Sequence, residues 1–398
     1  MATPTYQEYL NALASPNRKQ LIKIEQLYKT LNGGFEVYNE ITSDVANTSG
    51  ALSITIQNGL RRKLSFIINN PTYKHKINSS DIWLDSYFKL SIGLQISEDY
   101  VYWTDQGIFV LDDSTINTSS PSARTIEINA LDLASLLDGT LSGYLESSYS
   151  ISNGNLLKDS ITSIIEDSGD YSPIIFDSIY DDYCTTYEIT VSLGSTYTTL
   201  LDKLAEFRTS NYFYNENGYF CFRSGIEDIS DTFKPVLYSF NTDGTDINLI
   251  SCSVKYNIEK VKNYIKVVGD TTDSGVIYCG IAYDDDPSSP TSITQIGKRV
   301  AEPLTIDNIE SDEYCVDRAV YELRKCFWTS LTITIVSIPV LHLDVNCIVE
   351  ITDINSGFDH QKLLIQNIEY DLKDGSTMTL TCSNIFDVDY TIITGEAS

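Results

Sequence analysis

Residues 52–71 read LSITIQNGLRRKLSFIINNP, and this stretch shows how most of the chain is built. Apolar and polar side chains alternate over residues 52–56, and a second apolar run over residues 64–68 ends at Asn69-Asn70-Pro71. Alternation with a period of two is typical of a strand with one buried face, and an Asn-Asn-Pro cluster is typical of a turn. We therefore expect two strands here.

The same alternation extends along the chain in both directions. Clusters of Asn, Asp, Gly and Ser interrupt it at short intervals, which is the pattern of antiparallel sheets. We expect a turn at Asp105-Gln106-Gly107 and a hairpin turn over residues 215–218. The other expected strands are Ile22–Glu25, Phe88–Leu94, Tyr100–Trp103, Ile108–Leu111, Thr125–Ala130, Tyr212–Tyr214, Tyr219–Arg223, Ser251–Tyr256, Tyr264–Val268, Val276–Ile281, Leu331–Val336, Cys347–Ile351, Leu363–Leu372 and Met378–Cys382.

Three stretches have a helical period instead, namely Leu156–Glu166, Ser195–Arg208 and Ser311–Phe327. In the last of them, Ser311 is placed to cap the first turn, and two acidic residues follow at the positive end of the helix dipole. The apolar residues of this helix fall on one face, so we expect that face to pack against a sheet. They are Val316, Val320, Leu323 and Phe327.

The chain of 398 residues is longer than one typical domain, so we expect more than one core. The predicted fold class is mainly β, a β-rich α+β chain in which two all-β sections, each a barrel or a sandwich, flank a smaller α+β section. The predicted boundaries are an N-terminal arm at 1–14, a first β domain at 15–135, an α+β insert at 136–244 and a second β domain at 245–398 with an inserted helix at 311–327.

Acidic residues outnumber basic ones, with 55 Asp plus Glu against 27 Lys plus Arg and a net charge of -28. Nucleic-acid binding needs clustered Lys and Arg that release counterions, and anionic membranes attract the same residues. The composition therefore argues against both functions. It favours solubility, and it would repel DNA that passes through a channel.

We expect no targeting or membrane-spanning segment. Residues 1–14 lack a basic start and an apolar core long enough for a secretory signal. The longest apolar stretch, Ile333–Leu343, is interrupted by polar residues and is too short to span a bilayer. The chain is therefore expected to be made in the cytosol and not to insert into a membrane.

The eight cysteines never form a Cys-x-x-Cys pair, and the chain has three histidines. A zinc site needs clustered Cys and His ligands. We therefore expect reduced, mostly buried thiols that pack as small hydrophobes, and we predict no metal and no cofactor.

No familiar catalytic motif occurs in the sequence. The chain lacks a G-x-S-x-G elbow, an H-E-x-x-H pair and a Gly-rich phosphate loop. Two carboxylates can serve a glycosidase, but among 55 acidic residues some pair always looks suitable. We assign no catalytic residue and expect a protein that is not an enzyme.

Two acidic clusters offer oxygen ligands of the kind that calcium prefers. They are Asp284-Asp285-Asp286 and residues 241–246, and neither has the ligand spacing and closing Glu of an EF-hand, so solvated loops are the expectation. His75, in a predicted turn region, and His360, in a Gly-containing loop, are expected at the surface.

Aromatic residues leave two further questions open. A sugar-binding platform is one interpretation of the tryptophans, and core or subunit contacts are the simpler one; the residues are Trp83, Trp103 and Trp328. Near the N-terminus, a short amphipathic pattern fits docking on a neighbouring subunit as well as a frayed terminus; it is made by Tyr6, Tyr9, Leu10 and Leu13.

Several short motifs follow one another in a distinctive order. The first group is WTDQGIFVL (103–111), IEINALD (126–132) and LLDG (136–139), and the second is the helix at 198–207 with NENGYF (215–220). The third is Val267-Val268-Gly269, Ile296-Gly297, the helix that starts at Ser311, IPVLHLDV (338–345) and IEYDLKDGSTMTL (368–380). In order and spacing, over nearly the whole chain, they resemble the phage tail and baseplate hub family, which includes the base of type VI secretion spikes.

The resemblance implies a homotrimer in which two tail-tube-like β-barrel domains per chain form a ring with six matching faces. In the family, 338–345 looks like the turn into a strand and 368–380 like a closing hairpin. Three copies would carry 3 × -28 = -84 formal charges, so DNA would pass through an acidic lumen without binding. The implied partners are further copies of the chain, a tail-tube or distal-tail protein, a tip spike or fibre protein and, as another candidate, the tape-measure protein.

The sequence thus predicts a structural hub of a phage or phage-like tail baseplate, assembled in the cytoplasm of a bacterial host. The residues of its subunit interface stay unassigned. Two alternatives remain open, a receptor- or carbohydrate-binding tail adhesin and a cell-wall hydrolase.

Overall fold

The computed structural model describes residues 5–15, 18–30, 33–120, 123–206, 209–225, 234–242, 248–271, 275–306, 311–373, 375–385 and 390–395. Over these ranges the chain is mainly β with large antiparallel sheets, which confirms the predicted class. The chain forms two compact units. Unit 1 comprises Met1–Ser224, Val336–Val345 and Asn367–Leu380, and unit 2 comprises Gly225–Ile335, Asn346–Gln366 and Thr381–Ser398.

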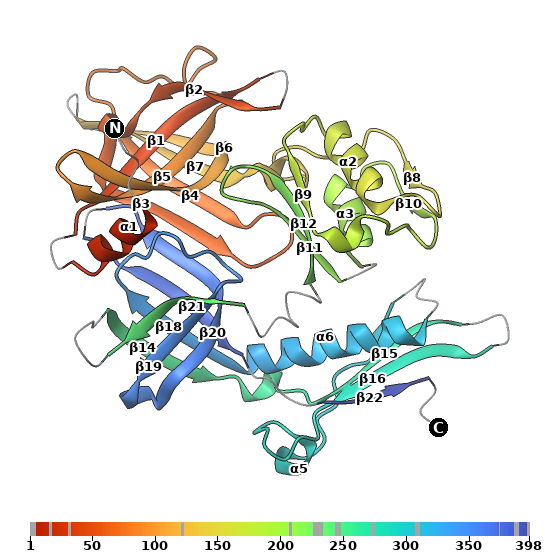
Figure 1. Cartoon of the computed structure of the whole chain (residues 1–398). Coiled ribbons are helices and arrows are strands. Elements are labelled where there is room, and N and C mark those ends of the chain that lie inside the picture. Colours follow the sequence, from red (N-terminus) through yellow and green to blue (C-terminus); the bar gives the residue numbers. More distant parts are fainter. Residues whose placement is uncertain are drawn as a thin grey trace. The chain divides into compact units, whose positions relative to one another are not determined.

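Unit 1 is built on one antiparallel sheet (Figure 1), whose strands follow the order β20-β3-β4-β7-β6-β5-β1-β2. Its strands are β1 (Gln20–Lys29), β2 (Phe35–Glu40), β3 (Val45–Thr55), β4 (Arg62–Asn69), β5 (Tyr87–Ser97), β6 (Tyr100–Ser120), β7 (Ala123–Asp132) and the last residues of β20 (Phe358–Asp371). Alternate residues of β4 are buried, as the period of two predicts. Among the described strands the pairing runs from β2 to β20 without returning, so this sheet is not closed into a barrel.

The predicted turn at residues 105–107 is wrong, because β6 runs straight through it. The pairing with β5 shifts between Leu90↔Gly107 and Ser91↔Asp105, which leaves Gln106 as the extra residue of a β-bulge. Gly107 has φ +151, a value that side-chain-bearing residues rarely adopt. Asp-Gln-Gly has the composition of a turn, and here that composition serves a bulge instead.

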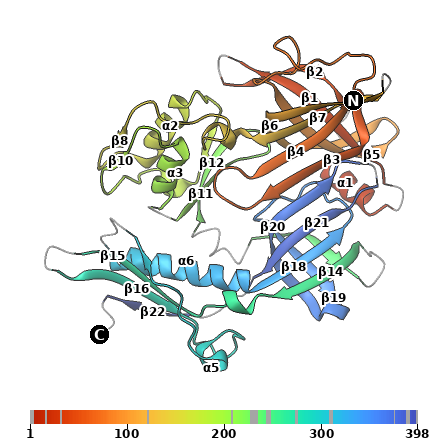
Figure 2. The same ribbon diagram turned by 180° about the vertical axis from the view of Figure 1, so that it is seen from behind.

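A smaller α+β section of unit 1 follows. Its elements are β8 (Tyr149–Ile151), α2 (Leu157–Asp167), β9 (Ile174–Phe176), β10 (Ile189–Val191), α3 (Tyr197–Glu206), β11 (Ser210–Tyr214) and β12 (Phe220–Ser224). Strands β8 and β10 pair with each other, and β12 pairs with both β11 and β9. Helices α2 and α3 pack together beside these strands (Figure 2) and bury a shared apolar core. The hairpin expected over residues 215–218 is confirmed, with Tyr214 opposite Phe220.

Unit 2 holds two groups of strands. The first comprises β13 (Val236–Asn241), β14 (Leu249–Tyr256), β18 (Leu331–Ser337), β19 (Ile348–Asp353), most of β20 and the end of β21 (Met378–Asn384). The second is a four-stranded sheet in the order β17-β15-β16-β22, from β15 (Tyr264–Thr271), β16 (Ile277–Tyr283), β17 (Leu304–Thr305) and β22 (Thr391–Thr394).

Helix α6 (Asp312–Ser330) covers one face of the four-stranded sheet of unit 2 (Figure 1). Ser311 is the N-cap, and its hydroxyl accepts a hydrogen bond from the Tyr314 backbone N–H at 3.4 Å, as predicted. The apolar face packs on β15 and β16. Gly280 of β16 lies so close that a Cβ there would be 2.2 Å from the Val316 backbone nitrogen.

The three predicted helices are confirmed as α2, α3 and α6, although residues 207–208 lie outside the described ranges. Of the described helices, two were not predicted as such, α1 (Tyr6–Leu13) and α5 (Ile293–Ile296). Short 3-10 turns also occur at Thr42–Asp44, Leu133–Leu136, Ser178–Tyr180, Ile258–Lys260 and Ile354–Ser356. Within the described ranges, no helix combines the length and hydropathy needed to span a lipid bilayer.

Candidate functional site, a buried arginine junction

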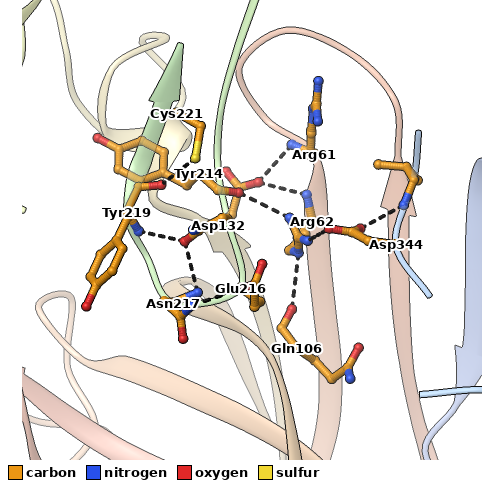
Figure 3. A network of polar contacts seen from close by, with 12 residues as sticks. Arg61, Arg62, Gln106, Asp132, Tyr214, Glu216, Asn217, Tyr219, Cys221 and Asp344 are labelled. Carbon is orange, nitrogen blue, oxygen red and sulfur yellow. Dashed lines mark hydrogen bonds and ion pairs between the residues drawn. The ribbon is translucent and has the colours of Figure 1, made fainter. Parts of the chain in front are cut away.

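Arg62, the first residue of β4, lies at the centre of a polar network in unit 1 (Figure 3). Its side chain is 2% exposed. The guanidinium donates from Nε to the Gln106 carbonyl at 3.1 Å, from Nη1 to the Tyr214 carbonyl at 3.1 Å, and from Nη2 to the Asp344 carboxylate at 2.5 Å. Arginine suits this position because its planar fork presents several donors in fixed directions.

The three acceptors come from three segments that are far apart in the sequence. Gln106 is the bulge residue of β6, Tyr214 ends β11 of the α+β section, and Asp344 belongs to the 338–345 segment. The Gln106 side chain adds a second link, because its Nε2 donates to the Leu341 carbonyl at 3.2 Å. One buried cation therefore fixes the sheet, the α+β section and the 338–345 segment together.

Asp132, the last residue of β7, holds the backbone beside Arg62. Its Oδ2 accepts the backbone N–H groups of Arg61 and Arg62 at 2.8 Å each, and its Oδ1 accepts that of Ala134 at 3.0 Å. The carboxyl is fully buried, and burial raises its pKa to about 6 although these hydrogen bonds act in the opposite direction. Asp132 thus ties the start of β4 to the 3-10 turn at Leu133–Leu136, which directly follows β7.

Arg61 is also buried, and it contacts the β11–β12 hairpin. Its guanidinium carbon lies 3.6 Å from the centroid of the Phe213 ring, and its Nε donates to the Gln57 carbonyl at 2.6 Å. A cation over an aromatic face is attracted by the ring quadrupole. Adjacent arginines therefore contact adjacent residues of the β11–β12 hairpin, Arg61 the Phe213 ring and Arg62 the Tyr214 carbonyl.

Helix α1 fastens the 338–345 segment at its other end. The Tyr9 hydroxyl accepts the Leu341 backbone N–H at 2.9 Å and lies 3.1 Å from His342 Nδ1, and the Tyr9 ring stacks on Tyr102. The Tyr370 hydroxyl donates to the Val340 carbonyl at 3.2 Å. Tyr9 and Leu13 are buried within their own chain, whereas Tyr6 is 46% exposed, so this helix is ordered by its own chain, and docking on a neighbouring subunit stays a prediction.

The sequence prediction assigned no site residue, and this network was missed. One signal was available, because two adjacent arginines follow Gly59 and Leu60 in a chain poor in basic residues. A buried arginine must be paired, so a partner elsewhere was to be expected. What the arrangement does is mechanical: it holds separate segments in one geometry.

His75 is buried rather than at the surface, which corrects the prediction. Its side chain is 2% exposed, with Nε2 2.9 Å from Asp44 Oδ2 and Nδ1 3.7 Å from Asp81 Oδ2. The Asn70 side chain bonds both the backbone nitrogen and the backbone carbonyl of His75, and this folds the loop inward. Hydrogen bonds from Lys74 and His75 lower the pKa of Asp44. The flanking lysines gave a misleading signal of exposure.

The acidic triplet is only partly a solvated loop. Asp284 is fully buried, and its Oδ2 accepts the hydroxyls of Ser289 at 2.6 Å and Thr291 at 3.0 Å, whereas Asp285 is exposed. The prediction for Asp284 was therefore wrong, because local hydroxyl donors compensate its burial. Of the other acidic cluster, residues 243–246 lie outside the described ranges.

The remaining residues singled out in the sequence are His360, the three tryptophans and the cysteines. His360 is exposed as predicted, and its Nδ1 lies 3.0 Å from Glu350 Oε1. Trp83 and Trp103 are 41% and 40% exposed, and nothing is described of the Trp328 side chain. All eight cysteines are free as predicted, but only four of them are buried and the other four are partly exposed.

Open antiparallel sheets, a small α+β section and the bridging 338–345 segment define a class of fold found in phage tail proteins. A tail protein from Neisseria meningitidis MC58 shares this fold at 12% identity and a TM-score of 0.61, covering 92% of this chain and 97% of that one. The 43 kDa tail protein of prophage MuSo2 from Shewanella oneidensis matches at 14% identity and a TM-score of 0.61, covering 91% and 98%.

A chain of the Francisella PdpA-VgrG complex in its half-lidded form has a TM-score of 0.51 at 12% identity, covering 98% of this chain and 62% of that chain. The family model that matches is described as a domain of unknown function (DUF5048) and aligns with residues 288–388. No curated protein matches the chain. The resemblance to tail-hub proteins seen in the sequence motifs is therefore confirmed at the level of the fold.

Proposed function

We propose that the chain is a structural hub subunit of a phage or phage-like tail baseplate. One observation carries the proposal: two tail proteins match it over at least 91% of either chain, so the likeness covers the whole architecture and not one common module. A fold by itself supports many functions, but a match across several sections in one order narrows the choice.

The hub is a homotrimer whose chains each contribute two similar β sections, so that three copies present six matching faces to a hexameric tail tube. The predicted division at 15–135, 136–244 and 245–398 is part of this proposal. With a net charge of -28 per chain, the ring is acidic, and DNA passes through its channel without binding. A basic or apolar bore in the assembled ring would contradict this channel.

The Arg62 junction fits a part that transmits force between the tube and the tip. A hub that flexed between its sections would lose the register of its faces. Arg62 joins the sheet of unit 1 to the α+β section through its buried hydrogen bond to the Tyr214 carbonyl, and Asp132 holds the backbone of Arg61 and Arg62 in place. Hydrogen bonds with a charged donor or acceptor are stronger than neutral ones. The junction keeps unit 1 stiff, and the chain works by assembly rather than by turnover.

The partners in this proposal are further copies of the chain, a tail-tube or distal-tail protein, a tip spike or fibre protein and the tape-measure protein. The location is the tail particle. Co-expression of the tagged chain with the tube and spike proteins of the same gene cluster tests this directly. We expect both proteins to co-purify with the chain, and electron microscopy to show a ring at one end of the tube. Recovery of the chain alone, with tubes that form normally without it, would overturn the proposal.

A second candidate, a carbohydrate-binding tail adhesin, is favoured by Trp103. Its indole lies over Gly93, where a Cβ would come within 2.7 Å of the ring, and 40% of Trp103 remains exposed. A flat, exposed indole on a sheet is a platform on which sugars stack. If the wild type binds host cells or cell-wall glycans and Trp103→Ala does not, the adhesin function is supported. Equal binding by the wild type and the variant would rule out Trp103 as the sugar platform.

A further inference from the structure

Strand β2 is an edge of the unit 1 sheet. It pairs with β1 on one side, and no described strand pairs with its other side. Val37 and Tyr38 of this strand are 54% and 59% exposed. An edge strand offers a row of free backbone donors and acceptors, and exposed apolar side chains on it make a site for the addition of another strand.

Strand β14 is an edge of unit 2 with the same character. Its only neighbour among the described strands is β18. Ile250 and Tyr256 of this strand are 59% and 74% exposed, and of its eight residues five are exposed, two are partly exposed and only Leu249 is buried. Unit 2 therefore also presents an apolar edge that its own described strands leave open.

The two edges carry opposite charges. The charged residues of β2 are Glu36 and Glu40, both exposed, whereas the charged residue of β14 is Lys255, also exposed. Residues 257–262 after β14 add Lys260 and Lys262 against Glu259. In a chain with twice as many acidic as basic residues, a basic edge is unusual.

Charges on edge strands also protect against aggregation, so the pattern has to be weighed against that role. Glutamates disfavour pairing of β2 with another β2, and lysines disfavour pairing of β14 with another β14. Neither set opposes pairing of β2 with β14. Protection alone gives no reason for Val37, Tyr38, Ile250 and Tyr256 to be exposed on the same two strands.

We propose that β2 of one copy pairs with β14 of the next copy, with Glu36 and Glu40 facing Lys255. This inference rests on the proposed hub, for which it names the subunit interface. Two different surfaces that bind each other make a head-to-tail contact, and such contacts close into a ring when the rotation permits. This interface buries the apolar residues of both edge strands. It also avoids pairing of β2 with β2 and of β14 with β14, which would bring like charges together.

Charge reversal with rescue tests the pairing. The variants are Glu36→Lys with Glu40→Lys, then Lys255→Glu, and then all three changes together, compared by analytical ultracentrifugation over a concentration series. We expect either reversal alone to weaken self-assembly about tenfold or more, because it places like charges opposite each other. The combined variant should return to within about threefold of the wild type, since the pairs are restored in the opposite sense.

Two matched reversals serve as controls, Glu98→Lys in the β5–β6 turn and Lys63→Glu on β4, both at exposed positions. They should leave self-assembly unchanged. Circular dichroism checks that each variant is folded. Hydrogen exchange of the unmodified chain gives a second readout, with slower exchange of β2 and β14 amides expected in the assembled state than in dilute solution.

The outcomes separate this inference from the proposed function. If the wild type assembles while the reversals and the exchange rates of β2 and β14 show no effect, the edge pairing is wrong and the ring stands. If the wild type stays monomeric at every concentration, the self-assembling ring is wrong and the pairing falls with it.

Discussion

At the scale of single residues, the fold of unit 1 depends on the hydrogen-bond partners of one buried cation, Arg62. Arg62 is 2% exposed, and its guanidinium uses one carboxylate and two backbone carbonyls as partners. The Asp344 side chain is 34% exposed, so water can solvate its carboxylate when Arg62 is removed, and the loss of this ion pair costs little. The buried carbonyls of Gln106 and Tyr214 would lose their donor, and each such loss costs about 1–3 kcal/mol.

We expect Arg62→Met to lower the free energy of unfolding by about 2–4 kcal/mol, because two buried carbonyls lose their donor. Lys63→Met at the next position is the control, because Lys63 is exposed and should change stability by no more than about 0.5 kcal/mol. Urea denaturation followed by fluorescence measures both. Equal stability of the two variants would show that the junction contributes nothing to the fold.

The pH dependence of stability tests the neighbouring carboxyl. The pKa of Asp132 is raised from 3.8 to about 6, so the native state holds this proton more tightly than the unfolded state does. The stability contributed by protonated Asp132 is therefore full below about pH 4 and is lost as the pH rises through 6.

We expect the stability difference between wild type and Asp132→Asn to shrink as the pH rises from 4 to 7, by about 3 kcal/mol at most. Urea titrations at several pH values measure it, with Asp138→Asn, an unburied aspartate, as the control. A difference that grows with pH would mean that the buried carboxyl is stabilised in its charged form.

The contacts between individual side chains could largely not be predicted from the sequence. The partners of Arg62 are at positions 106, 214 and 344, and nothing in the period of a strand indicates contacts across such separations. His75 was misjudged for a related reason, because its burial depends on the Asn70 hydrogen bonds and on Asp44 from an earlier segment.

At the scale of elements, α6 and its sheet depend on one close approach. A Cβ on Gly280 would lie 2.2 Å from the Val316 nitrogen and 2.3 Å from the Cys315 carbonyl carbon. Backbone atoms within a helix cannot move aside as a flexible side chain can, so the whole helix would have to shift away from β16.

We therefore expect Gly280→Ala to lower the free energy of unfolding by about 3 kcal/mol and to reduce the protection of α6 amides from hydrogen exchange. Gly34→Ala is the control, because the nearest atom to its Cβ is the Thr30 hydroxyl at 3.3 Å. A Gly280→Ala protein as stable as the control would show that α6 does not pack on β16 as described.

Elements with a strong local signal were predicted well. Helix α6 has a capping serine and one apolar face, and β4 alternates cleanly, so local chemistry and packing agree. The bulge at Gln106 was mistaken for a turn because both use glycine, and only the pairing with β5 separates the two. Helix α1 is short, but it begins with a capping box in which the Thr5 and Glu8 side chains accept each other's backbone N–H, and this local signal was not used in the prediction.

At the scale of the molecule, the class of fold followed from the alternation of residues, and the order of motifs pointed to tail-hub proteins. The predicted closure of the β sections into barrels is not found in unit 1, where the described strands pair in an open order. The division into three sections remains a prediction. Assembly remains a proposal too, because edge strands such as β2 reveal their partners only in the presence of other copies.

The molar mass of the purified chain, measured by light scattering across a range of concentrations, tests the central claim most directly. The account predicts a plateau at three times 44.6 kDa, about 134 kDa, with ring-shaped particles in images of the same sample. A mass that stays at 44.6 kDa at every concentration would contradict it.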